Sequence, residues 1–280
     1  MTGAPRLRAR PSAGSAEAAS SSSRVSWRRW TLRALSVLTL FLLWNGVSAV
    51  RLRLPFVSFA NLPAPAEVAE AFLALANTGK LQSHIAASLT RVLAGYFLAA
   101  TVGVVVGVLV ARGRSIEDIV MPTLELARPI PAVAWIPLAI LMFPSSEASM
   151  IFITFTGALF PILLNSIDAV REVDRRLIAS ARSLGANETT IIREIVIPGA
   201  MPGVVTGLSI GMGTCWFCLV TAEMISGQLG IGYYTWESYT LQNYPDIVVG
   251  MLVIGVLGSA SSAAVRGLGA VVMPWRRKNS

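Results

Sequence analysis

The sequence has few of the side chains from which catalytic and metal sites are built. Its 280 residues include one histidine, His84, and two cysteines, Cys215 and Cys218. No nucleophile or metal-ligand pattern surrounds His84, and the G-x-x-x-x-G-K-S/T loop that holds ATP phosphates does not occur. The cysteines lie three residues apart within one apolar run, which is typical of packing residues. We therefore predict no catalytic residue, no metal site and no cofactor in this chain.

Charged residues are also scarce. They make up 14% of the chain, whereas 54% is hydrophobic, and the mean hydropathy is +0.64. A chain this apolar is not an ordinary soluble domain, so we predict an all-α polytopic membrane protein surrounded by lipid. The net charge of +8 is compatible with nucleic-acid binding. However, the basic residues flank apolar runs, which is the pattern of membrane orientation, and we expect no nucleic-acid partner.

Six apolar runs are predicted to cross the membrane. They cover about 32–50, 85–111, 119–143, 150–167, 199–222 and 247–265. With this map, 18 of the 23 Lys and Arg residues fall on one side, and only Arg51, Arg53 and Lys80 fall on the other. Because basic segments stay in the cytoplasm, we expect both termini inside. The predicted domains are then a disordered basic tail (1–31), a membrane domain (32–273) and a second basic tail (274–280).

The first apolar run has two interpretations. Val47-Ser48-Ala49 resembles a signal-peptide cleavage site, which would remove the run from the mature protein. A retained span is favoured, because the basic residues at both ends of the chain require an even number of crossings.

Small residues recur every four positions in two of the predicted spans. Such stripes allow the backbones of two membrane helices to approach closely. The first stripe comprises Ala99, Gly103, Gly107 and Ala111, and the second comprises Gly203, Gly207 and Gly211. Both are predicted to be helix packing faces.

The third predicted span cannot be one straight helix, because prolines interrupt it. They are Pro122, Pro129, Pro131 and Pro137. Glu125 and Arg128 lie in this span, three residues apart, and a charge at membrane depth is costly unless it is paired or functional. Two interpretations remain open: a structural Glu125–Arg128 pair, and a path for an anion that includes Arg128.

A polar segment at 170–198 separates two apolar runs. Apolar residues at helical spacing predict a short surface helix that Gly185 ends in the left-handed conformation. Asn187 is expected to cap a second helix from Glu188 to Val196, and Pro198 is expected to stop it. The segment is therefore a helical hairpin at the membrane surface.

The hairpin carries a motif. Ala181-x-x-x-Gly185, nine residues and then Ile195-x-Ile197-Pro198 resembles the EAA loop of ABC importer permeases. This resemblance implies a cytoplasmic coupling helix that docks on a separate ATPase subunit. The sequence departs from the pattern at Ala179, where the family has Glu. The resemblance assigns ATPase coupling to Ala179, Ser180, Ala181, Arg182, Gly185, Ala186, Glu188 and Pro198.

Other segments resemble the nitrate, sulfonate and taurine branch of these permeases. They are LPAPAEV (62–68), SLTRVLAGY (88–96), ARPIPAVAWIPL (127–138) and AEMISGQLGIGYYTWESYTL (222–241). The last resembles an outer re-entrant loop that helps to close the outer gate. The acidic residue that the branch often has near 263–264 is replaced by Ala263 and Ala264. The translocation path and gate are assigned to Arg128, Pro131, Trp135 and Glu223.

The resemblance implies a six-span type I ABC importer permease fold in a bacterial cytoplasmic membrane. The expected partners are two ATPase subunits, which bind ATP and Mg, a second permease copy and a periplasmic or lipid-anchored substrate-binding protein. The implied cargo is a small anion: sulfonate or taurine, nitrate or nitrite, or bicarbonate.

Two other classes of function are alternatives to an ABC importer permease: a secondary transporter and a membrane-embedded enzyme. An ion-coupled secondary transporter would use Glu125, Arg128 and Glu223 at broken helices, but the inverted repeat expected of it is not evident. A membrane-embedded enzyme is disfavoured by the missing catalytic pattern.

Overall fold

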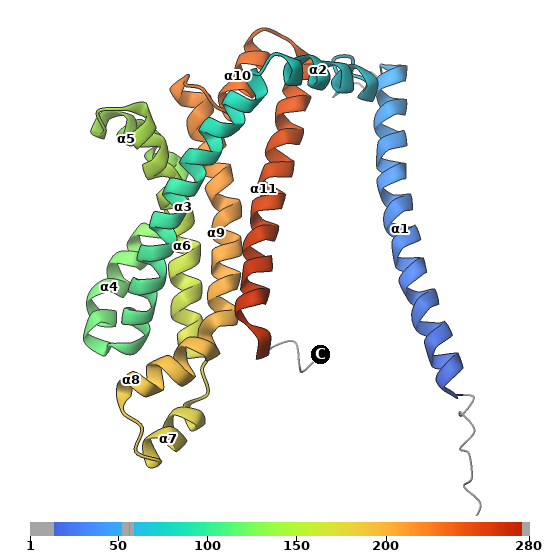
Figure 1. Cartoon of the computed structure of the whole chain (residues 1–280). Coiled ribbons are helices and arrows are strands. Elements are labelled where there is room, and N and C mark those ends of the chain that lie inside the picture. Colours follow the sequence, from blue (N-terminus) through green and yellow to red (C-terminus); the bar gives the residue numbers. More distant parts are fainter. Residues whose placement is uncertain (1–13, 52–55, 57–58, 276–280) are drawn as a thin grey trace, which may run out of the picture. The chain divides into compact units, whose positions relative to one another are not determined.

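A computed structural model describes residues 14–51, 56 and 59–275, which are largely helical and contain no strand (Figure 1). The chain forms two compact units, residues 1–66 and 67–280. The helices are α1 (Gly14–Val50), α2 (Pro65–Asn77), α3 (Lys80–Arg112), α4 (Arg114–Ala127), η1 (Ala132–Trp135), α5 (Ile136–Met142), α6 (Ser146–Arg171), α7 (Arg175–Ser183), α8 (Glu188–Ile191), η2 (Ile192–Val196), α9 (Ile197–Ser226), α10 (Ile231–Thr240) and α11 (Tyr244–Val272).

The first unit is built on α1. The indole N–H of Trp44 donates to the carbonyl of Pro63 at 3.1 Å, and the Ser48 hydroxyl donates to the carbonyl of Leu62 at 3.0 Å. These bonds hold the segment after the helix against its C-terminal end. The apolar part of α1, Trp30–Val50, is long enough to cross a membrane.

The start of α1 differs from the disordered tail expected over 1–31. The helix begins at Gly14, and residues 16–19, Ala-Glu-Ala-Ala, favour a helix there by their intrinsic propensity. Residues 1–13, and residues 276–280 of the predicted second tail, lie outside the described part of the chain. Whether the first span is retained stays a prediction.

Among its described residues, the second unit holds four more helices that are long and apolar enough to span, together with one bent pair. The pair consists of α4 and the segment Ala132–Met142, and the two parts meet at an angle of 83°. The predicted third span, 119–143, is therefore not a straight crossing. The break falls at residues 128–131, because Pro129 and Pro131 cannot donate the backbone hydrogen bonds that would continue the helix.

Helix α6 is the centre of the second unit, and both predicted small-residue stripes pack against it. A Cβ added at Gly107 of α3 would lie 2.7 Å from the Cβ of Ser166. A Cβ added at Gly207 of α9 would lie 2.6 Å from the Cβ of Asn165. Ile162 of α6 lies against both stripes, since added Cβ atoms at Gly103 and Gly211 would reach its side chain at 3.0 Å and 2.6 Å. The stripes are confirmed as packing faces.

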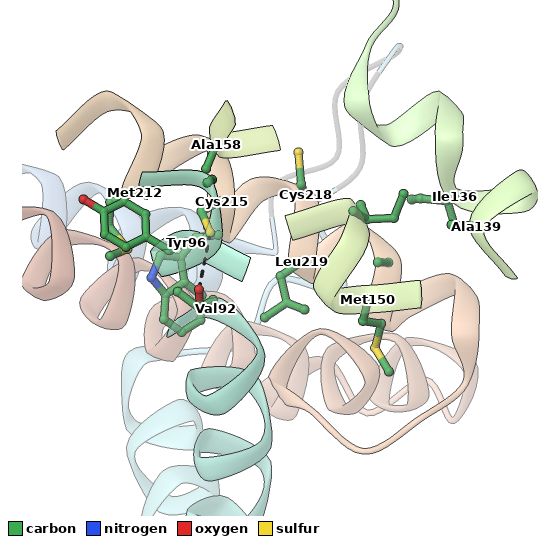
Figure 2. Close-up of a cluster of buried hydrophobic side chains, with 14 of the residues drawn as sticks. Val92, Tyr96, Ile136, Ala139, Met150, Ala158, Met212, Cys215, Cys218 and Leu219 are labelled. Carbon is green, nitrogen blue, oxygen red and sulfur yellow. Dashed lines mark hydrogen bonds between the residues drawn. The ribbon is translucent and has the colours of Figure 1, made fainter. Parts of the chain in front are cut away.

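A cluster of buried side chains fills the space among α3, α5, α6 and α9 (Figure 2). Cys215 and Cys218 belong to it, with 0% and 4% of their surface exposed, and the Cys215 thiol lies 3.7 Å from the carbonyl of Val92. Both cysteines are free and pack against apolar neighbours, as the sequence predicted.

The second hairpin helix does not stop at Pro198, and this prediction was wrong. After Ile191 the chain makes a π turn, Ile192–Val196, and continues directly into α9. Pro198 lies in the first turn of α9, directly after the bond from the Ile197 N–H to the Ile192 carbonyl five residues back, so the change in the α hydrogen-bond pattern falls where the proline lacks its N–H. The result is one helical segment from Glu188 to Ser226, 39 residues long, instead of a span that starts at Gly199.

The close packing of α6 and α9 generates a prediction. Gly207→Leu places a side chain where backbone and Cβ atoms of α6 already lie, so we expect a loss of about 1 to 3 kcal/mol of stability or more. Gly213→Leu on the same helix is the control, because nothing lies within 4 Å of an added Cβ there. Thermal unfolding of the detergent-purified chain measures both. Equal effects of the two substitutions would contradict the packing scheme.

Candidate functional site

The polar hairpin begins with two well-defined caps. The Asp174 carboxylate accepts a hydrogen bond from the Arg176 N–H at 2.8 Å and so caps α7. At the end of α7, the Gly185 N–H donates to the Arg182 carbonyl and the Ala186 N–H donates to the Ala181 carbonyl, both at 3.0 Å. This pair of bonds is a Schellman motif, which requires a left-handed residue at Gly185. Its φ of +83° confirms the predicted conformation.

The second helix of the hairpin starts as predicted. The Asn187 side chain accepts a hydrogen bond from the Thr190 N–H at 2.8 Å. Between the two caps, Ala181 and Ala186 pack with Ile178 against the buried side chains of Ile191 and Val196. The hairpin is therefore held to the end of the helical bundle by its own small apolar core.

Glu188 connects three elements by ion pairs. Its carboxylate accepts hydrogen bonds from Arg182 of α7 at 2.9 Å and from Arg112 at the end of α3 at 2.7 Å. The Glu188 side chain is 56% exposed, and exposed ion pairs contribute little to stability. Their effect is to set the orientation of α7 relative to the ends of α3 and α8.

A pocket of about 340 Å³ lies between the hairpin and the bundle. Its polar lining consists of Arg112, Arg171, Arg175 and Arg182, and Ala179 forms part of its wall. Arg171 forms an ion pair with Glu117. Arg112 and Arg182 both form ion pairs with Glu188. Among the described residues Arg175 has no ion pair. The pocket thus has more cationic than anionic groups and can accept a carboxylate.

The residues assigned to the translocation path lie at the bend between α4 and η1. Arg128 and Pro131 are exposed, and Trp135 is half-buried against the main core cluster. Within the described part of the chain, Glu125 and Arg128 form no ion pair. Both side chains are exposed on the surface of the single chain. The structural-pair interpretation is therefore not supported.

Glu223, the fourth residue assigned to the path and gate, is fully buried within the chain. Its carboxylate accepts hydrogen bonds from the Ser88 hydroxyl at 2.8 Å, the Arg91 guanidinium at 2.8 Å and the Gly232 N–H at 2.9 Å. These donors come from α3 and α10, so Glu223 joins both elements to the end of α9.

Arg91 completes this buried group and was not singled out by the sequence reasoning. It is 3% exposed and also binds both carboxylate oxygens of Glu147 and the Leu229 carbonyl. A sequence signal was present: His84, Ser88 and Arg91 share one helical face inside an apolar run. The name buried charge cluster is used below for the buried pair Arg91 and Glu223 together with Glu147, whose side chain is 57% exposed.

His84, on the same face of α3, also contacts the loop before α10. Its Nδ1 lies 2.9 Å from the Gly230 carbonyl.

The described residues contain no group of three His, Cys, Asp or Glu placed to hold a metal ion. The buried charge cluster ties α3, α6 and α9 to the loop before α10. Helix α10 lies at the end of the second unit opposite α7 and α8 (Figure 1). The cluster therefore holds these elements together, whereas the hairpin is exposed and basic.

Comparison with known proteins gives a consistent result. Residues 103–278 match the family described as binding-protein-dependent transport system inner membrane component. The chain is 31% identical over 265 residues to the taurine transport system permease protein TauC of Escherichia coli. This alignment covers 91% of this chain and 94% of that protein. It is 32% identical over 228 residues to the nitrate import permease protein NrtB of Synechocystis sp., covering 78% and 83% respectively.

Solved structures show a related fold. The crystal structure of an amino acid ABC transporter matches with a TM-score of 0.55 and 16% identity, over 72% of this chain and 97% of that chain. At this identity the match concerns the fold alone. It agrees with the all-α permease fold that the sequence predicted.

The buried charge cluster generates a second prediction. Arg91→Gln leaves Glu223 as an unpaired buried carboxylate, and breaking such a pair costs about 3 to 5 kcal/mol. Adding Glu223→Gln removes that charge, so the double variant is expected to recover part of the loss. Thermal unfolding of the detergent-purified variants gives the double-mutant cycle. The control is Arg171→Gln, at an exposed ion pair, where little change is expected. If the stability loss of the double variant equals the sum of the losses of the two single variants, Arg91 and Glu223 do not stabilise each other.

Proposed function

Because the chain belongs to the family of binding-protein-dependent transport system inner membrane components and is the permease subunit of an ABC importer, we propose that its hairpin is where ATP hydrolysis is coupled to transport. The observation that carries this proposal is the capped, outward-facing hairpin at residues 174–198. Gly185 holds its turn in the left-handed conformation, a small core anchors the hairpin to the bundle, and the hairpin continues directly into α9. Movement of a partner bound there would act directly on a membrane-spanning helix.

Each residue assigned to coupling then has a defined part. Gly185 and Ala186 fix the turn, and Ala181 packs the hairpin to the bundle. Arg182 and Glu188 set the angle of α7, while Pro198 lies in the first turn of α9. Ala179 and Ser180 are exposed on the docking face.

The basic pocket beside Ala179 completes the docking surface. A Glu at position 179, as the family has, would put a carboxylate into the chain's own pocket. With Ala179 there, we propose that an acidic side chain of the ATPase subunit enters the pocket and binds Arg175, which has no ion pair among the described residues.

The assembly that we propose contains two copies of this permease and two ATPase subunits, which bind ATP and Mg, so that this chain itself has no catalytic role. A periplasmic or lipid-anchored substrate-binding protein delivers the cargo. The location is the bacterial cytoplasmic membrane, with both termini and the hairpin in the cytoplasm. The basic residues of the hairpin support this orientation.

The cargo that we propose is a small anion: sulfonate or taurine, nitrate or nitrite, or bicarbonate. The taurine and nitrate permeases among the relatives support this class. Arg128, Pro131 and Trp135 line the path at the bend after α4. Glu223 acts at the outer closure, by holding the loop before α10. The ion-coupled secondary transporter is set aside, because the relatives are permease subunits of ABC importers.

The coupling role is tested at Gly185. Gly185→Val forces a β-branched side chain into the left-handed region, at a cost of about 1 to 2 kcal/mol. We expect the permease to insert normally but to retain fewer ATPase subunits, and hydrolysis to become uncoupled from uptake. Copurification of the ATPase and uptake into proteoliposomes measure these effects. Gly185→Asn is the control, because Asn tolerates this conformation. Full ATPase retention and wild-type uptake by Gly185→Val would refute the coupling assignment.

The same assay tests the basic pocket. Arg175→Gln breaks no ion pair among the described residues, so the fold should be unaffected while ATPase retention falls. Arg176→Gln, at a neighbour outside the pocket, is the matched control. Equal retention by the two variants would show that the pocket receives no carboxylate.

The path assignment is tested at Arg128. Arg128→Ala should lower uptake severalfold or more while ATPase assembly persists, because removing this exposed side chain leaves no buried charge unpaired. Arg128→Lys should be intermediate, since Lys lacks the planar fork that binds an oxyanion in two places. Arg114→Ala, at the other end of α4, is the control. Wild-type uptake by Arg128→Ala would remove Arg128 from the path.

A further inference from the structure

A second pocket lies at the end of the bundle opposite the hairpin. Its volume is about 620 Å³, and it is lined by α2, α10 and the first turns of α3 and α11. These elements lie together at the top of Figure 1, away from α7 and α8. Four carboxylates line the pocket, from Glu67, Glu70, Glu237 and Asp246, against the single ammonium of Lys80. The name acidic socket is used for this pocket.

Three of the four carboxylates have no cationic partner among the described residues. Glu70 forms no ion pair. Glu237 accepts a hydrogen bond from the Tyr233 hydroxyl at 3.2 Å, and Asp246 accepts one from the Asn243 amide at 2.6 Å. Both donors are neutral, so the charges of Glu70, Glu237 and Asp246 are not paired within the described part of the chain, and the socket keeps an excess of negative charge over Lys80.

An independent observation concerns Tyr234. Its side chain is buried, with 8% exposed, and its hydroxyl makes no hydrogen bond of normal geometry. Burial and the nearby Asp246 carboxylate raise the pKa of Tyr234, so the hydroxyl stays protonated. A buried hydroxyl without a partner is costly. Tyr234 lines the acidic socket, and its hydroxyl lies close to the Asp246 carboxylate, so a cation held by Asp246 would come to lie beside this hydroxyl.

The remaining lining suits an aliphatic chain. Ala71, Ala74, Leu75 and Pro245 form apolar walls between the carboxylates. A Lys or Arg side chain has this character, since its methylene stem packs on apolar surface and its charged head seeks carboxylates. A compact metal ion would not use these walls, and the described residues provide no metal-binding group of three acidic, His or Cys side chains.

We propose that the acidic socket receives a Lys or Arg side chain of the substrate-binding protein when that protein docks on the permease. The proposal rests on the function and orientation proposed above, which put the socket on the outer side. The aliphatic stem packs against the walls, and Glu70, Glu237 and Asp246 surround the cationic head. The Tyr234 hydroxyl accepts a hydrogen bond from it.

The first arm of the test fixes the side of the membrane. Asn77→Cys, on α2 beside the socket, should react with a membrane-impermeant thiol reagent added to spheroplasts, and Ser183→Cys in the hairpin should not. Cys215 and Cys218 are buried and give little background. The reverse labelling pattern would overturn both the orientation and the socket.

The second arm measures docking with the assembled importer and its purified substrate-binding protein. The variant Glu70→Gln, Glu237→Gln, Asp246→Asn should need at least tenfold more binding protein for half-maximal stimulation of ATP hydrolysis. Its dependence on salt should also be weaker. Retention of the ATPase subunits should match wild type. Asp118→Asn, at an exposed acid of α4 that lies outside both the socket and the hairpin, is the control and should change nothing.

Tyr234→Phe gives a finer test, because it removes only the hydroxyl. We expect the free permease to unfold at the same or a higher temperature, and docking to weaken about two- to fivefold. Unchanged binding-protein affinity in the neutralised variant, with normal ATPase assembly and uptake, would overturn the socket and leave the proposed function standing. Failure of the wild-type chain to assemble with any ATPase subunit would instead overturn the proposed function.

Discussion

Close contact between helix backbones is the constraint on which the rest of this structure depends. In a membrane, helices gain no hydrophobic free energy by associating with one another, so packing must come from direct contact. Glycines on α3 and α9 allow both helices to reach α6, and Ile162 lies between them. Only with these three helices fixed can Arg91 of α3 meet Glu147 of α6 and Glu223 of α9. The same contact holds the hairpin end of α9 next to the end of α3.

Local patterns made much of this structure predictable. The glycine stripes, the left-handed Gly185 and the Asn187 cap depend on neighbouring residues, and all three are confirmed. The bend after α4 follows from its prolines in the same way. The EAA-like spacing and the branch segments also indicated the family and the permease fold.

Features that depend on tertiary structure were missed. Arg91 and Glu223 are separated by 132 residues, so no local spacing pairs them. Glu125 and Arg128 are neighbours on a helix, yet both are exposed and no ion pair joins them. Pro198 was expected to end a helix, because the sequence does not show the π turn that comes before it. The excess of arginine in the pocket beside Ala179 arises only where α3, α6 and α7 converge.

The π turn at Ile192–Val196 also has a consequence for rotational register. In a regular α-helix each residue turns the chain by 100°, and the π turn holds one residue more than an α turn. The π turn takes up that extra residue within one wider turn, so deleting it would let a regular α-helix form with the hairpin in nearly the same rotational phase about α9. A second deletion would find no π turn left to absorb it, and it would turn the hairpin by about 100° about the axis of α9. The π turn therefore acts as a one-residue reserve between the hairpin and the membrane helix.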